Sequence, residues 1–96
     1  MVEKKEPTHV LQSPEQLEAI SKRLKRAHGQ LAAVIRMLEE GRNCDEIVTQ
    51  MAAVNKAVNT AAFTLISTSL KECIVDNKNN NQAVQEKLQK LFLSLA

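Results

Sequence analysis

The 96-residue chain is short of aromatic side chains and of the residues that interrupt helices. It has two Gly, two Pro, two Phe, and neither Trp nor Tyr. With Phe63 and Phe92 alone, it lacks the set of rings on which single-stranded nucleic acid stacks, so duplex DNA is the better nucleic-acid target. The apolar fraction, 44%, is mostly Ala, Leu, Ile and Val, beside many Gln, Lys and Glu. This composition predicts one small, all-α domain.

Several functional motifs are also absent. No stretch approaches the 18 apolar residues of a membrane span, and the start, Met1–Glu6, is charged and has no apolar core of a secretory signal. We therefore expect a cytoplasmic protein with no membrane partner. The sequence has no Gly-rich phosphate loop, paired carboxylates, Ser/His/Asp set or CxxC motif. We expect neither an enzyme nor a bound cofactor.

Local signals divide the chain into three helices. Ser13 followed by Pro14 and Gln16 is typical of a helix start, and Gly41 of a helix end. We expect residues 1–12 to form a flexible arm and 13–96 a helical domain. Within the first helix, Gly29 predicts close packing against another helix. Its expected apolar stripe consists of Leu17, Ile20, Leu24, Leu31, Val34, Ile35 and Leu38.

The second helix is expected over about 43–76, opened by a capping box of Asn43 and Glu46. It is apolar on more than one face, which is typical of a helix buried between neighbours. The run 77–81 is rich in Asn and predicts a loop, and the third helix is expected from about Gln82 to Leu95. Three such helices cannot bury all their apolar positions in one chain, so we expect an oligomer.

Cys44 and Cys73 are the only cysteines, and no Gly or Pro lies between Asn43 and Asp76. On one unbroken helix, their separation of 29 residues spans about 43 Å and returns to within about 20° of the same face. One chain therefore cannot join them. In an antiparallel pair of chains, Cys44 of each would lie beside Cys73 of the other. The alternative for each is a small apolar core residue.

A basic cluster lies in the first helix at Lys22, Arg23, Lys25 and Arg26, with no acid between Glu18 and Glu39. It is either a solvated helix face or a surface for phosphates. His28, and the arm lysines Lys4 and Lys5, are expected to extend it. Neither His28 nor His9 has a partner at metal-ligand spacing.

Three stretches carry a resemblance to a known family: Arg23–Gln30, Arg36–Cys44 and Thr49–Val54. Together they resemble the copper-sensing operon repressors, the CsoR/RcnR family, over about residues 14–95. The resemblance implies a three-helix protomer, an antiparallel four-helix-bundle dimer and a flat tetramer. It also implies double-stranded operator DNA as the partner, bound by the basic cluster and released by an inducer at the cysteines.

The family divides by inducer. The copper(I) branch has a His four residues before its second Cys, where this chain has Ser69. The nickel and cobalt branch needs a His in the arm near Gln12, and the formaldehyde branch lacks the second Cys. The segment Ile66–Cys73 resembles instead the CsoR-like sulfurtransferase repressors (CstR), which sense persulfide and polysulfide. No metal is expected on this interpretation.

The sequence therefore predicts a repressor released from DNA when Cys44 and Cys73 of neighbouring protomers form a di- or polysulfide bridge. Cys44, at a helix start that favours thiolate, is expected to react first. One alternative is a copper(I) sensor with a two-thiolate site at Cys44 and Cys73. An alternative of another class is a helical protein-interaction module.

Overall fold

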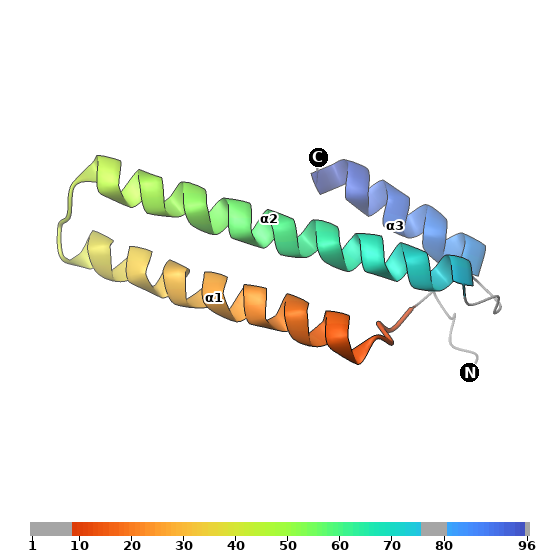
Figure 1. Ribbon diagram of the computed structural model, residues 1–96. Helices are drawn as coiled ribbons and strands as arrows, with labels where there is room; N and C mark the ends of the chain where they lie inside the picture. Colours follow the sequence, from red (N-terminus) through yellow and green to blue (C-terminus); the bar gives the residue numbers. More distant parts are fainter. Residues whose placement is uncertain (1–8, 76–80, 96) are drawn as a thin grey trace, which may run out of the picture.

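A computed structural model describes residues 9–75 and 81–95 of the chain. Within these ranges all regular structure is helical: α1 (Pro14–Glu39), α2 (Cys44–Val75) and α3 (Asn81–Leu95). Figure 1 shows α1 and α2 side by side as a long antiparallel hairpin, with α3 against the second half of α2. This confirms the all-α, three-helix prediction. The predicted Asn-rich loop is cut short, because Asn81 already belongs to α3 and residues 76–80 lie outside the described part.

Both ends of α1 follow the predicted local signals. The Ser13 backbone is extended, and its hydroxyl accepts a hydrogen bond from the Gln16 amide at 3.3 Å. At the other end Gly41 has φ +70. The Gly41 amide donates to the Leu38 carbonyl at 3.2 Å, and the Arg42 amide to the Met37 carbonyl at 3.0 Å. This pair of bonds is a Schellman motif, which satisfies carbonyls that a helix end otherwise leaves unpaired.

α2 is one unbroken helix of 32 residues, about 48 Å long at 1.5 Å per residue. Its first turn differs from the predicted capping box. The Glu46 carboxylate pairs with Arg42, both Nε and Nη2 lying 3.1 Å from the same oxygen. This ion pair bridges the α1–α2 connection to the first turn of α2. None of the described helices is long and apolar enough to cross a bilayer.

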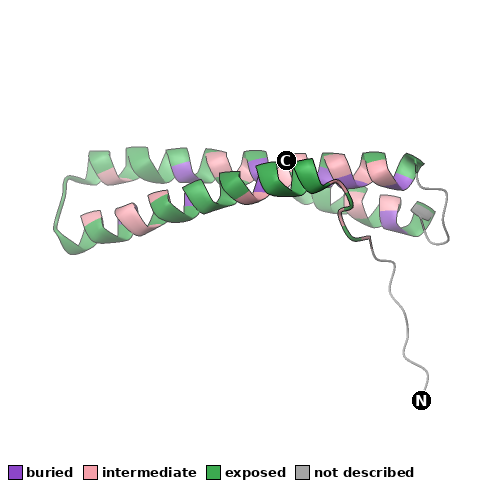
Figure 2. Cartoon of the chain, turned by 60° about the horizontal axis from the view of Figure 1, so that its bottom comes forward, coloured by how far each residue is buried: buried purple, intermediate pink, exposed green. Residues whose placement is uncertain are grey.

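The core of the hairpin is a single line of small and medium side chains. Ile20, Ala27 and Val34 are buried in α1, and Val54 and Ala61 are buried in α2, which packs against it. Purple patches along the α1–α2 contact mark this line in Figure 2. The two alanines, 3% and 1% exposed, allow the helices to approach closely. α3 adds the buried Val84 and an edge-to-face contact of Phe63 with Phe92, with ring centroids 5.1 Å apart.

The predicted α1 stripe is only partly buried. The buried residues recur every seven positions, and so do four exposed leucines displaced from them by about 60° around the helix. Two packed helices share one line of contact, so the neighbouring line stays open in a single chain. The exposed members of the predicted stripe are Leu17, Leu24, Leu31, Ile35 and Leu38.

The predicted close packing at Gly29 is wrong within the chain. A Cβ added at Gly29 would meet nothing within 4 Å, and the same holds at Gly41. The two glycines differ in backbone conformation, since only Gly41 has a positive φ. Gly41 is therefore required by the turn, whereas Gly29 only lowers the stability of α1.

Replacing Gly41 by Ala should destabilise the fold by about 1–2 kcal/mol, because a side chain is strained at φ +70. The matched control, Gly29→Ala, should stabilise it by about 0.5–1 kcal/mol through helix propensity. Chemical unfolding of both variants at one protein concentration measures the two effects. Equal shifts of the same sign would contradict this assignment.

Candidate functional site

The two cysteines lie at opposite ends of α2, as the sequence predicts. Cys44 is its first residue and Cys73 lies two residues before its end. The 29 residues between them span about 43 Å of straight helix, so the two sulfurs cannot meet within one chain. Cys44 is an exposed, free thiol, whereas Cys73 is only 1% exposed. A centre that uses both thiols needs two chains.

An apolar surface, which we call the open seam, runs along one side of the hairpin. On α1 it consists of the exposed leucines described above. On α2 it begins at Cys44 and continues every seven residues through Met51, Val58 and Leu65. Leu17, Leu24 and Leu65 line the same groove, so the two rows are contiguous.

The open seam has the pattern by which helices pair lengthwise. Apolar residues at a seven-residue spacing keep to nearly one side of a helix over many turns. A hairpin that presents two such rows can complete a four-helix bundle with a second hairpin. Cys44 lies at one end of this surface.

Cys73 lies at the other end of α2, the half of the helix in which Ile66 and Ser69 are also buried. Ser69 is 8% exposed and lies one turn before Cys73 on α2. Within residues 9–75 and 81–95, no three His, Cys, Asp or Glu side chains are grouped to hold a metal. The thiolate donors suit a soft ion such as copper(I), but one chain supplies them at separate places.

Next to Cys73 the structure reveals a contact that the sequence analysis missed. The Glu72 carboxylate accepts hydrogen bonds from His9 Nε2 and the Gln12 amide, both at 2.8 Å, and from the Ser13 amide at 3.0 Å. His9, Gln12 and Ser13 therefore contact α2 through Glu72. His9 thus has a carboxylate partner, although it lies 63 residues away in the sequence.

The same contact perturbs the charge state of Glu72. The Gln12 amide, with smaller contributions from His9 and Ser13, lowers the pKa of Glu72 below its ordinary value, against an opposing effect of desolvation. The carboxylate is thus held ionised, as its three donors require. No local pattern signals this contact, since the partners are 59 to 63 residues apart.

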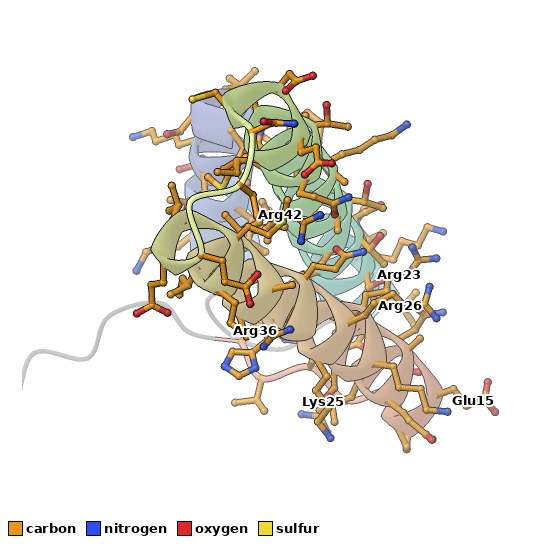
Figure 3. All side chains as sticks on the ribbon, turned by 90° about the vertical axis from the view of Figure 1, so that its left-hand side faces the viewer. Glu15, Arg23, Lys25, Arg26, Arg36 and Arg42 are labelled. Carbon is orange, nitrogen blue, oxygen red and sulfur yellow. The ribbon has the colours of Figure 1, made fainter. Side chains whose placement is uncertain are left out.

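The side chains of the predicted basic cluster are all exposed. Figure 3 shows Arg23 and Arg26 projecting from the same flank of α1, while Lys25 projects from a different side. Lys25 and His28 border the groove of the open seam. Lys22 pairs with Glu18 at 3.3 Å, both highly exposed. Lys4 and Lys5 lie outside the described residues.

Comparison with known proteins identifies the family. A family model described as a metal-sensitive transcriptional repressor matches residues 16–94. The copper-sensing transcriptional repressor CsoR of Bacillus subtilis is 32% identical over 79 residues, which cover 79% of this chain and 78% of CsoR. The copper-sensing transcriptional repressor RicR of Mycobacterium tuberculosis is 35% identical over 60 residues, 62% of each chain. This chain thus spans about three fifths of the length of RicR.

A further relative carries no functional name. The uncharacterized protein YrkD of Bacillus subtilis is 35% identical over 49 residues, which cover 51% of this chain and 78% of YrkD. No solved structure matches the chain. The residues that match the family model make up most of the sequence, and this range includes both cysteines and the basic cluster. The chain therefore belongs to the metal-sensitive transcriptional repressor family.

Proposed function

We propose that the protein is a DNA-binding repressor whose sensing centre is shared between two chains, Cys44 from one and Cys73 from the other. The main observation in support of this proposal is the open seam. It leaves two contiguous apolar rows without a partner in the chain, and it begins at one of the two cysteines. Membership of a repressor family favours this function over the helical protein-interaction module that the sequence also allows.

Pairing across the open seam accounts for both cysteines at once. Two hairpins that join their seams antiparallel form a four-helix bundle, with the start of each α2 beside the end of the other. A two-fold axis then gives two equivalent centres per dimer. We propose that two such dimers form a flat tetramer, which would multiply the Arg23 and Arg26 pairs available to double-stranded operator DNA.

Copper(I) is the inducer that the comparisons favour, since two relatives are named as copper-sensing repressors. Two thiolates are a suitable donor set for this soft ion, and Ser69 adds no soft ligand. We propose that Cys44 and Cys73 of neighbouring chains bind copper(I) between them. Binding would fix the chains in an arrangement that fits DNA poorly, and this difference in affinity releases the operator.

Reactive sulfur is the second candidate inducer, and Ser69 in place of a His favours it. The Cys44 thiolate attacks the sulfane sulfur of a persulfide, forming Cys44–S–SH and releasing the persulfide's thiol. The Cys73 thiolate of the neighbouring chain then attacks the Cys44 sulfur, forming a disulfide and releasing hydrosulfide. A polysulfide leaves extra sulfur atoms in the bridge, which relaxes the Cα separation limit of about 7 Å for a simple disulfide.

A shared centre predicts complementation between two inactive variants. Cys44→Ser and Cys73→Ser should each abolish the response to inducer, because each removes one member of every centre. An equimolar mixture, unfolded and refolded together, should recover about a quarter of the wild-type centres, since half the dimers then keep one intact pair. Release of the chain's own upstream DNA, followed by gel shift, measures the recovery. No recovery in verified heterodimers would contradict the shared centre.

The two candidate inducers should give different products when each is added to the reduced protein bound to DNA. Copper(I), buffered by a competing chelator, should release DNA without a covalent dimer, and excess chelator should reverse it. An organic polysulfide should instead yield a covalent dimer with added sulfur, reversed by dithiothreitol. Non-reducing mass spectrometry and gel shift distinguish the two, with hydrogen peroxide as the control oxidant. DNA release by copper(I) alone would reject the sulfur reaction, and release by polysulfide alone would reject copper.

Arg23→Ala should weaken binding to the upstream DNA and reduce the slope of log affinity against log salt by about one for each copy that contacts a phosphate. The matched control is Lys90→Ala, which removes an exposed charge on α3 and leaves the basic cluster of α1 unchanged. Binding isotherms at several salt concentrations measure both quantities. Equal behaviour of the two variants would place the DNA interface elsewhere.

A further inference from the structure

We propose that Glu72 is a positioning residue that ties the arm segment, His9–Ser13, across the Cys73 end of the open seam, so that the arm controls access to Cys73. This inference rests on the proposed function, because it concerns the thiol that the shared centre uses. It adds a step to that function: the arm segment must leave before Cys73 can meet an inducer or the Cys44 of another chain.

The hydrogen bonds between the arm segment and α2 use both oxygens of the Glu72 carboxylate. Glu72 Oε1 accepts from the His9 ring and the Gln12 amide, and Oε2 accepts from the Ser13 amide. Hydrogen bonds to an ionised acceptor are the stronger kind, and the side chains of His9 and Glu72 are only 11% and 18% exposed. One side chain therefore fixes the direction in which the chain enters α1.

The tie lies on the open seam itself. Along α2 the row of Cys44, Met51, Val58 and Leu65 continues, seven residues on, at Glu72. This position would meet a second chain, yet here the arm segment occupies it. Leu11 confirms the placement, since this half-buried residue lines the seam groove together with Leu17 and Leu65.

Cys73 directly follows Glu72 and is 1% exposed. A thiol buried to this degree reacts only when a local opening exposes it. In the antiparallel pairing proposed above, the Cys44 end of a second chain arrives where the arm segment lies. The free energy of releasing the arm segment thus enters the reaction rate of Cys73, and Glu72 supplies much of it.

The test measures alkylation of Cys73 by N-ethylmaleimide in the full chain, on a Cys44→Ser background that leaves one thiol. Glu72→Gln keeps the side-chain shape but offers one acceptor oxygen in place of two. It should raise the alkylation rate of Cys73 about three- to tenfold, the factor expected when an opening loses one net hydrogen bond. His9→Ala, outside every helix, should raise it by a smaller factor. Glu86→Gln, an exposed carboxylate on α3, is the matched control and should leave the rate unchanged.

Hydrogen exchange separates release of the arm segment from general loosening. In Glu72→Gln, the amides of Gln12 and Ser13 should exchange faster, while peptides around Val54 and Ala61 keep their protection. A Cys73 rate within twofold of the parent in both Glu72→Gln and His9→Ala would overturn the proposal, and so would loss of protection throughout α2. If Glu72→Gln fails to fold, His9→Ala decides. The measurement uses neither DNA nor inducer, so its failure leaves the shared centre standing, and a failed complementation leaves this test intact.

Discussion

The structure depends on the stiffness of α2. Because no Gly or Pro interrupts it, the helix runs unbroken from Cys44 to Val75 and holds its two thiols about 43 Å apart. If the two thiols act together, as we propose, one chain cannot bring them into contact. The two thiols also differ in their surroundings, since an open apolar row begins at Cys44 and Cys73 is buried.

The division of the apolar residues into two rows explains how a small hairpin can be ordered and still present an interface. Ala27 and Ala61 bring α1 and α2 together along the buried row, where larger side chains would hold them apart. The larger leucines stand in the neighbouring row and remain exposed. Burying that row in a second copy would supply the apolar contact that a 96-residue chain cannot obtain alone. Association and sensing would then use the same surface.

The chemistry of the centre depends on what surrounds the thiols. Ser69 leaves the pair without a nitrogen ligand, which is compatible with copper(I) held by two thiolates and with sulfur transfer between them. Copper-sensing relatives favour the first, and the Ser favours the second. Glu72 adds a feature that neither chemistry requires. A carboxylate beside Cys73 binds the segment that leads into α1, and α1 carries the basic cluster. The residue next to Cys73 therefore contacts the segment that leads into the helix with the basic cluster.

The sequence by itself determined the features that depend on bonds between near neighbours. Ser13 and Gly41 mark the ends of α1 because caps and turns are made within a few residues, and the separation of Cys44 from Cys73 follows from helix geometry alone. The tertiary structure decided which of two adjacent apolar rows is buried, that Gly29 faces open space, and that Glu72 holds His9 and the amides of Gln12 and Ser13. These depend on how α1 rotates against α2, and contacts across some 60 residues leave no periodic trace in a single sequence.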